Sequence, residues 1–307
     1  MRAFALTVAS IAVVGSAALG SDAQTAAELL AAARQALGGD ATLTAVKSFT
    51  VSGSLNRDLG RLGTTSDLEI SCELPDKFVR MTHRRIDMGP MGSSDMTEFR
   101  GFNGDEPIQE TIAPDAPAPP LIQTGPPPTT PEEIAAERRR RAVANKRVFV
   151  ELVLPLFAST FAGFPLDFKP AGTVPLATGP ADEIDASGPD GSLWFLFLDA
   201  STHLPVKLTW RAKPIVTFST TSMVTTTTRG QIMSSSPGNP VLLPADPTAG
   251  MSMVEWAMTI EDYKTADGLT WPHRFTTTVD GKKYEELRLK QFRINPKIDV
   301  KKFKPTK

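Results

Sequence analysis

Apolar and polar residues alternate with a period of two through the last part of the chain, which is the pattern of half-buried β-strands. The segments with this pattern are Val254–Tyr263, Leu269–Val279 and Tyr284–Ile294. Asp267-Gly268 and Asp280-Gly281 separate them, and Asp-Gly favours the positive φ angles of a tight hairpin turn. The pattern predicts an antiparallel meander with one apolar face, which must pack against a helix or enclose an apolar ligand.

The same period recurs earlier in the chain and predicts further strands. These are Lys47–Leu55, Thr65–Glu73, Asp76–Met88, Met96–Phe102, Leu193–Asp199, Leu204–Arg211 and a strand pair within Ile215–Thr228. Leu193–Asp199 is apolar on both faces, as expected for a central strand that is covered on both sides. Cys72, the lone cysteine, falls in the apolar phase of its strand and is expected in the core. The chain is therefore predicted to be mainly β.

Two segments have the spacing of helices. The first is Thr25–Leu37, and Gly38-Gly39 provides a natural stop. The second begins at Pro131, where a proline and two glutamates suit the first turn, and runs to about Ala158. It is expected to lie across the sheet with its Arg138–Arg141 run in solvent. The residues expected to be buried are Leu152, Leu156, Phe157 and Phe161.

A membrane span is the alternative for the end of the second helix. Val148–Phe168 is about as long as a bilayer span and follows a basic flank. Glu151, Pro155 and Asp167 interrupt its apolar run. These interruptions favour a helix that covers the sheet.

Residues 1–23 have the features of a secretory signal peptide, because Arg2 precedes the uncharged apolar run Ala3–Leu19 and small residues follow. The run is short for a retained anchor, so the mature chain is expected in the periplasm without a transmembrane segment. Residues 24–307 are expected to form one domain with a proline-rich insert at 113–131 and a serine- and proline-rich loop at 234–250. The eight prolines of the insert predict a loop or an extended polyproline stretch rather than a sheet.

Charge and motifs give little support for catalysis. The formal net charge is −1 with both signs mixed along the strands, so no basic face for nucleic acid is predicted. There is no cluster with metal-ligand spacing, no nucleotide-binding glycine motif and no G-x-S-x-G motif. We therefore predict a protein that is not an enzyme and has no metal and no cofactor. The alternative is a hydrolase that uses His83 or His203. It would require measurable turnover of ester or peptide substrates that is lost when either histidine is changed to Ala.

The remaining titratable groups have structural interpretations. His273 lies in the apolar phase of its strand and is predicted to be a hydrogen-bonded sheet histidine. The paired acids Glu261-Asp262 and Glu285-Glu286 lie next to hairpin signals and are predicted to be solvated strand edges.

A series of turn and strand motifs resembles a known group of exported bacterial proteins, the LolA/LolB-like superfamily of the outer-membrane lipoprotein-sorting type. The motifs are Leu37-Gly38-Gly39, Phe49–Leu55, Leu74–Arg80, Phe102-Asn103-Gly104, Phe197-Leu198-Asp199, His203–Lys207, Asp262-Tyr263-Lys264, Asp267-Gly268-Leu269 and Ile294-Asn295-Pro296. The resemblance implies a strongly curved antiparallel sheet, an incomplete barrel, that is closed by helices on its concave side around a hydrophobic cavity. It also implies that the cavity binds acyl chains or lipoprotein lipid anchors. The proline-rich insert and the 234–250 loop depart from the family's pattern.

These observations predict an exported, non-enzymatic carrier of a lipid, an acyl chain or a lipoprotein anchor. The residues predicted to line its cavity are Phe157, Phe161, Trp210, Trp256 and Met258. The alternative for these five residues is that they only pack the core. The alternative function is an envelope sensor or interaction module that binds a protein partner through the proline-rich insert.

Overall fold

The computed structural model describes residues 24–58, 63–87, 93–113, 122–124, 129–215, 220–221, 224–226, 232–234, 241–243 and 248–304. Its main element is a twelve-stranded antiparallel sheet with the order β5-β4-β3-β2-β1-β17-β16-β15-β10-β9-β8-β7. The predicted signal peptide, residues 1–23, lies outside the described residues.

The strands of this sheet are β1 (Ser48–Asp58), β2 (Gly63–Glu73), β3 (Lys77–Asp87), β4 (Ser93–Asn103), β5 (Glu106–Ile112), β7 (Asp167–Leu176), β8 (Gly179–Ser187), β9 (Leu193–Asp199), β10 (Pro205–Ala212), β15 (Val254–Ala266), β16 (Leu269–Val279) and β17 (Lys282–Ile294). The helices are α1 (Ala26–Ala36), α2 (Asp40–Ala45), α3 (Pro131–Phe157) and a short 3₁₀ helix, η2 (Val300–Phe303). The short strands outside the main sheet are β6 (Ile122–Thr124), β11 (Thr220–Thr221), β12 (Val224–Thr226), β13 (Ile232–Ser234) and β14 (Val241–Leu243).

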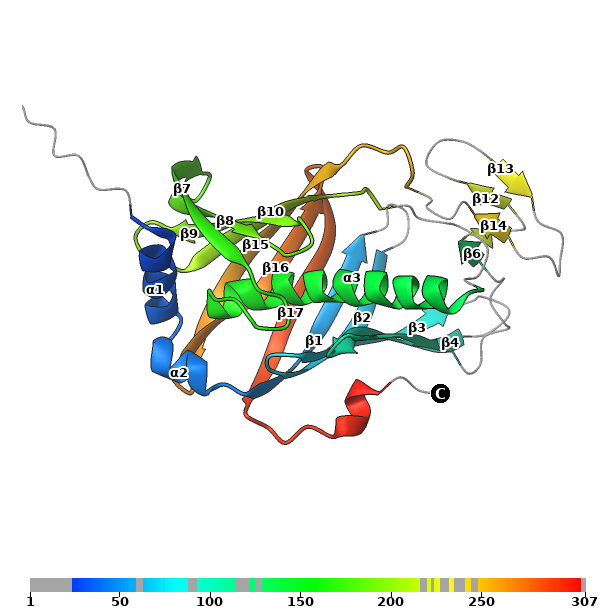
Figure 1. Cartoon of the computed structure of the whole chain (residues 1–307), viewed down its shortest axis with the longest axis horizontal. Coiled ribbons are helices and arrows are strands. Elements are labelled where there is room, and N and C mark those ends of the chain that lie inside the picture. Colours follow the sequence, from blue (N-terminus) through cyan, green and yellow to red (C-terminus); the bar gives the residue numbers. More distant parts are fainter. Residues whose placement is uncertain are drawn as a thin grey trace, which may run out of the picture.

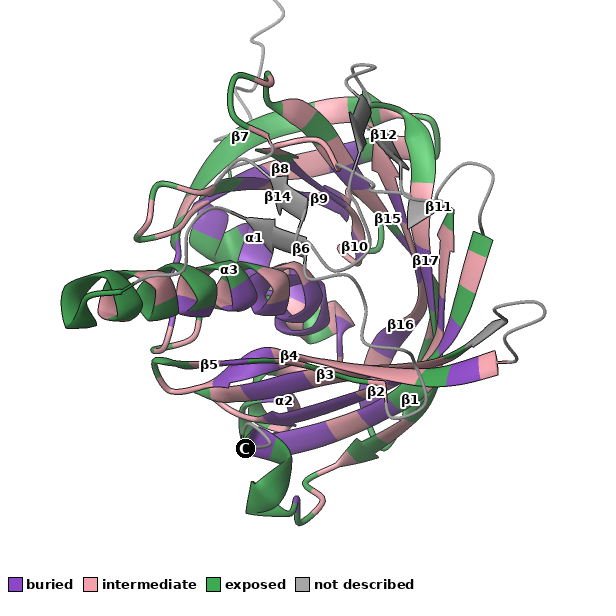
Figure 2. Ribbon diagram, turned by 90° about the vertical axis from the view of Figure 1, so that its right-hand side faces the viewer, coloured by how far each residue is buried: buried purple, intermediate pink, exposed green. Residues whose placement is uncertain are grey.

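The sheet is strongly curved, and α3 runs through its hollow side (Figure 1). Figure 2 shows the sheet bending from β5 and β4 round to β8 and β7, with α3 entering between these two ends. Among the described strands, β5 and β7 each have one neighbour in this sheet, so the sheet is not closed. The predicted fold class, a curved antiparallel sheet with a helix on its concave side, is confirmed.

Irregular pairing accompanies the curvature. The register shifts by one residue between Ser52 and Gly53 in β1 and between Thr277 and Thr278 in β16, and such bulges bend and twist a strand. Gly53 has a further role, because a Cβ atom there would lie 2.1 Å from the carbonyl oxygen of Arg288. Only glycine permits this close approach of β1 to β17.

The hairpins of the C-terminal meander follow the prediction. Asp267 and Gly268 have φ angles of 53° and 77°, and Asp280 and Gly281 have φ angles of 50° and 73°. Two consecutive positive φ angles match the right-handed twist of the flanking strands. The Asp-Gly dipeptides therefore place β15, β16 and β17 side by side.

Helix α3 begins with a capping box, in which the Thr130 side chain accepts from the Glu133 amide and the Glu133 carboxylate accepts from the Thr130 amide. Its N-terminal half is largely exposed, as Figure 2 shows, and the exposed part includes the predicted solvated run Arg138–Arg141. Its C-terminal half is buried from Leu152 to Ala158. Across the described parts of the chain, no helix combines the length and apolar character that a membrane span requires.

Polar contacts fix α3 at both ends of its buried half. The Asn145 amide donates to the carbonyl oxygens of Gly101 at 2.6 Å and Ile108 at 3.2 Å, which joins the helix to β4 and β5. At the helix end, the Trp271 indole donates to the Leu156 carbonyl oxygen at 3.1 Å. These donors satisfy carbonyl groups that the sheet edge and the helix end would otherwise bury without a partner.

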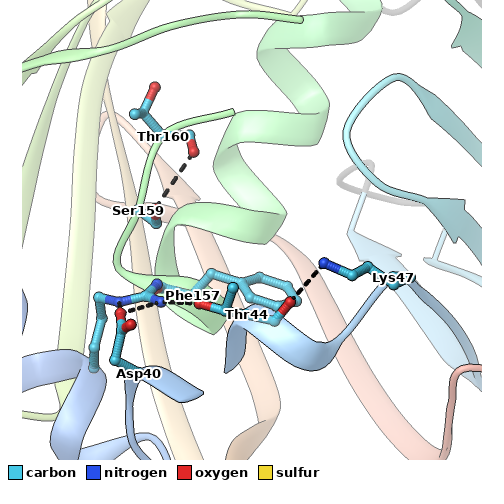
Figure 3. Close-up of polar contacts among 7 residues, drawn as sticks. Asp40, Thr44, Lys47, Phe157, Ser159 and Thr160 are labelled. Carbon is cyan, nitrogen blue, oxygen red and sulfur yellow. Dashed lines mark hydrogen bonds and ion pairs between the residues drawn. The ribbon is translucent and has the colours of Figure 1, made fainter. Parts of the chain in front are cut away.

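Arg34 of α1 is a second clamp at the same helix end. Its guanidinium donates to the Phe157 carbonyl oxygen at 2.9 Å, to Asp40 at 2.6 Å and to Thr44 at 3.2 Å. Figure 3 shows Phe157, Asp40 and Thr44 gathered at this point. One arginine therefore links α1, α2 and the C-terminus of α3.

Several elements were not predicted from the sequence. Helix α2 and the strands β5, β7 and β8 have no counterpart among the predictions, and β7 is mostly exposed, so it lacks an alternating pattern. The 113–131 insert was predicted to contain no sheet, and this was wrong for Ile122–Thr124, which pairs in parallel with Val241–Leu243 of the 234–250 loop. These three residues lie between the two groups of prolines in the insert and each carry an amide hydrogen, so they can form ladder hydrogen bonds. Within Ile215–Thr228 the described pair is short, Thr220–Thr221 with Val224 and Thr225.

We expect Leu156→Asp to destabilise the protein by about 3 kcal/mol or more, because Leu156 is 0% exposed and an unpaired buried carboxylate is costly. Arg139→Glu, at an exposed position of the same helix, should leave the free energy of unfolding nearly unchanged. Urea unfolding of both variants measures the difference. A Leu156→Asp protein as stable as the parent would show that burial of the C-terminal half of α3 does not stabilise the protein.

Candidate ligand-binding cavity

A cavity of about 310 Å³ lies between α3 and the concave face of the sheet. Its helix wall is made of residues on successive turns of α3: Ala144, Arg147, Val148, Glu151 and Leu152. Its apolar sheet wall consists of Ile70, Phe78, Trp210, Ala212, Trp256, Met258, Phe275 and Leu287. The cavity therefore lies beside the middle of α3, where the exposed N-terminal half of the helix meets its buried C-terminal half.

Two stacked tryptophans form one side of the cavity. Trp210 of β10 and Trp256 of β15 are opposite each other in the register, and their rings stack at 5.9 Å with an interplanar angle of 23°. The Tyr284 ring of β17 meets Trp256 edge-on at 5.6 Å. Aromatic side chains of this kind offer a large, rigid apolar surface that loses little conformational freedom on binding.

The other side of the cavity is charged. Arg57, Arg80 and Arg100, on β1, β3 and β4, face it together with Glu98 and Glu285. Glu285 accepts from Arg57 at 2.8 Å and from Arg80 at 3.1 Å. Arg80 and Arg100 are directly opposite each other in the register, so two like charges share one face of neighbouring strands.

Two carboxyl groups of the cavity are shifted in opposite directions. Burial by itself raises the pKa of Glu285, but the neighbouring charges of Arg80 and Arg57 outweigh burial and hold the pKa below its usual value. Burial raises the pKa of Glu151 on α3 to about 8, and the charge of Glu285 adds to the rise while Arg80 opposes it. At neutral pH the Glu151 side chain therefore faces the cavity mainly as a neutral carboxylic acid.

The five predicted site residues divide into two groups. Trp210, Trp256 and Met258 line the cavity. Phe157 and Phe161 lie outside it, with their rings 5.6 Å apart. Phe157 also contacts Phe49 and Trp271, and Phe161 contacts Phe149, all at ring distances below 6 Å. Phe157 is the last residue of α3 and Phe161 lies in the segment that follows it, whereas the helix wall of the cavity comes from earlier turns of α3.

The charged side of the cavity was missed in the sequence, and one prediction about it was wrong. Glu285 and Glu286 were predicted to be solvated strand edges, but Glu285 is enclosed by two arginines and Glu286 is 8% exposed. The signal was present in the strand pattern: Arg80 is in phase with Phe78, and Arg100 is in phase with Phe102. A charged residue in the apolar phase of a strand faces the same side as the core.

Two of the three histidines, His273 and His83, share side-chain hydrogen bonds with neighbouring strands. His273 shares a hydrogen bond of 2.8 Å with the Leu289 carbonyl oxygen, which confirms the predicted sheet histidine. His83 shares one of 3.0 Å with Thr97 on the neighbouring strand. The parts of the chain that the structure describes contain no group of three or more His, Cys, Asp or Glu residues that could hold a metal ion. Cys72 is buried, as predicted.

No protein-family model and no curated protein matches the sequence. Among solved structures, the chain is similar to a LolA superfamily protein from Nitrosomonas europaea, with 11% identity, coverage of 92% of this chain and 98% of that one, and a TM-score of 0.43. The chain is also similar to a putative outer membrane lipoprotein-sorting protein domain from Vibrio parahaemolyticus, with 10% identity, coverage of 91% of this chain and 97% of that one, and a TM-score of 0.42. A DUF1329 family protein from Desulfovibrio piger is 6% identical, with coverage of 90% of this chain and 95% of that one and a TM-score of 0.40. The first two are proteins of the kind that the sequence motifs resemble.

The raised pKa of Glu151 leads to a prediction for stability. The pKa of about 8 in the folded protein is above the ordinary glutamate value of 4.5, so the unfolded state binds fewer protons and stability falls as the pH rises through this window. Glu151→Gln keeps the shape of the side chain and removes the titration. We expect the variant to gain on the order of 2 kcal/mol relative to the parent between pH 5 and pH 8.

Chemical unfolding at the two pH values measures this gain. Glu132→Gln, at an exposed position in the first turn of α3, is the matched control and should show the same difference from the parent at both pH values. An unchanged difference for Glu151→Gln would mean that Glu151 is ionised in the folded protein at neutral pH.

Proposed function

We propose that the protein is an exported, non-enzymatic carrier that holds a lipid, an acyl chain or a lipoprotein anchor in the cavity between α3 and the sheet. The observation that supports this most is the cavity itself, about 310 Å³ in volume and walled on one side by Trp210, Trp256 and Met258. Each methylene group moved from water to such a surface contributes about 0.8 kcal/mol. A partly enclosed alkyl chain is therefore sufficient for tight binding.

The remaining site residues have supporting roles in this proposal. Phe157 and Phe161 hold the end of α3 against the sheet, so they set the position of the helix wall rather than touch the ligand. The signal-like pattern of residues 1–23 supports a periplasmic location, where acyl-bearing molecules need carriers across water. No nucleic acid enters the proposal, since the strands carry mixed charge.

An envelope sensor or interaction module is the second candidate. It is favoured by the position of the proline-rich insert, which leads into Thr130, the N-cap of the helix that covers the cavity. A partner bound to the insert would act on α3 directly. Deletion of residues 114–120 separates the two functions, because a carrier keeps its ligand affinity and a sensor loses its protein partner.

The carrier proposal predicts a bound ligand. Protein purified from exporting cells, extracted with organic solvent and analysed by mass spectrometry, should release a lipid or an acyl compound in stoichiometric amount. The delipidated protein should bind a fluorescent fatty acid. Absence of both would exclude the carrier function.

Ala144→Phe should weaken binding of that fluorescent fatty acid about tenfold or more, because Ala144 is an exposed residue on the wall of the cavity and a larger side chain fills the space. Ala136→Phe is the matched control, exposed on the same helix and outside the cavity wall, and it should bind normally. Equal affinities for the two variants would place the ligand elsewhere.

A further inference from the structure

The charge of Arg100, one of the cations that line the cavity, has no ion-pair partner among the described residues. Among the described residues it has no carboxylate within the 4 Å of an ion pair, whereas Arg57 and Arg80 share Glu285 and Arg147 pairs with Asp190 at 2.6 Å. Its Nε atom is buried and has no hydrogen-bond acceptor. A buried N–H group of this kind is costly unless a water or a ligand supplies an oxygen.

A second donor in the cavity is in the same condition. The indole nitrogen of Trp256 is buried and has no acceptor in the described part of the chain, although its side chain lines the cavity. Tyr284 lies near both donors, because its ring contacts Trp256 at 5.6 Å and the charge of Arg100 opposes the rise that burial causes in the pKa of its hydroxyl. Both unmatched groups are donors, so the missing partner is an acceptor.

The charges around these donors favour an anion. The charges of Arg57 and Arg80 also act to lower the pKa of the Tyr284 hydroxyl, and the charge of Glu285 opposes them. The sheet residues Glu98 and Glu285 provide two carboxylates on this side of the cavity. The pKa of Glu151, raised to about 8, leaves the facing carboxyl of the helix mainly neutral at pH 7. The charged side therefore has an excess of positive charge.

From these contacts we infer that the ligand is an amphiphile with an acidic head group, a carboxylate or a phosphate, that binds Arg100 and the Trp256 indole nitrogen. Its alkyl chain then lies against Trp210 and Met258, on the apolar side of the same cavity. This inference rests on the proposed carrier function. It adds the polarity and the charge of the head group, which an apolar cavity alone does not specify.

The test compares four ligands that share a twelve-carbon chain: dodecanoate, dodecyl phosphate, dodecanol and dodecyltrimethylammonium. Binding to delipidated protein is followed below the micellar concentration by the change in tryptophan fluorescence. We expect the two acids to bind about tenfold more tightly than dodecanol, since a charge-assisted hydrogen bond to arginine is among the stronger polar contacts. The cation should bind most weakly, and the ratio of the two acids identifies the preferred head group.

Arg100→Leu should weaken binding of both acids about tenfold relative to binding of dodecanol. Arg293→Leu is the matched control, because Arg293 is an exposed residue on β17 outside the cavity wall, and it should change neither. Arg100→Lys keeps the charge and removes the forked geometry, so it should lose less affinity for the acids than Arg100→Leu. Thermal unfolding checks that each variant is folded.

Equal affinity of the parent for dodecanol and the acids would overturn the inference and leave the carrier function in place. An Arg100→Leu protein that still binds the acids more tightly than dodecanol would also overturn the inference. Failure of all four ligands to bind would overturn the carrier function itself. If Arg100→Leu does not fold, the four ligands on the parent and on Arg100→Lys decide the question.

Discussion

The burial of the C-terminal half of α3 in the hollow of the sheet is the interaction on which the rest of the structure depends. A twelve-stranded sheet with an apolar concave face cannot remain exposed to water, and α3 supplies the surface that covers it. The helix end is fixed by donors from distant parts of the chain, the Arg34 guanidinium and the Trp271 indole. These donors replace the hydrogen bonds that the last turn of any helix lacks, so the helix can end inside the protein.

The cavity follows from the same packing. Where α3 presents large apolar residues such as Leu156 and Phe157, side chains of the sheet fill the space. One to three turns earlier the helix presents Ala144, Val148 and Glu151, and the space is left open. The sheet changes character at the same place, from a phenylalanine-rich face to one with arginines and glutamates. The result is a cavity with an aromatic side and a charged side.

Glu285 is central to the charged side. It holds Arg57 and Arg80 in place, and its one negative charge offsets only one of the two positive charges, while all three groups remain largely buried. Such a cluster costs desolvation energy, so stability alone does not account for it. A role in recognising a polar or charged part of a ligand gives the cluster a functional reason, and the unmatched Arg100 beside it is consistent with that role.

The sequence by itself determined most of the strands, both long helices and the hairpin turns, because these depend on local patterns: a period of two, a period of 3.6 and Asp-Gly dipeptides. It also identified Trp210, Trp256 and Met258 as residues of one concave face. Strand β7 was missed because an exposed edge strand has no apolar phase to detect. Only the tertiary structure decided that Phe157 and Phe161 fill the core and that Arg57, Arg80, Arg100, Glu151 and Glu285 meet across a cavity. These residues come from four strands and a helix, and the curvature of the sheet and the position of α3 bring them together.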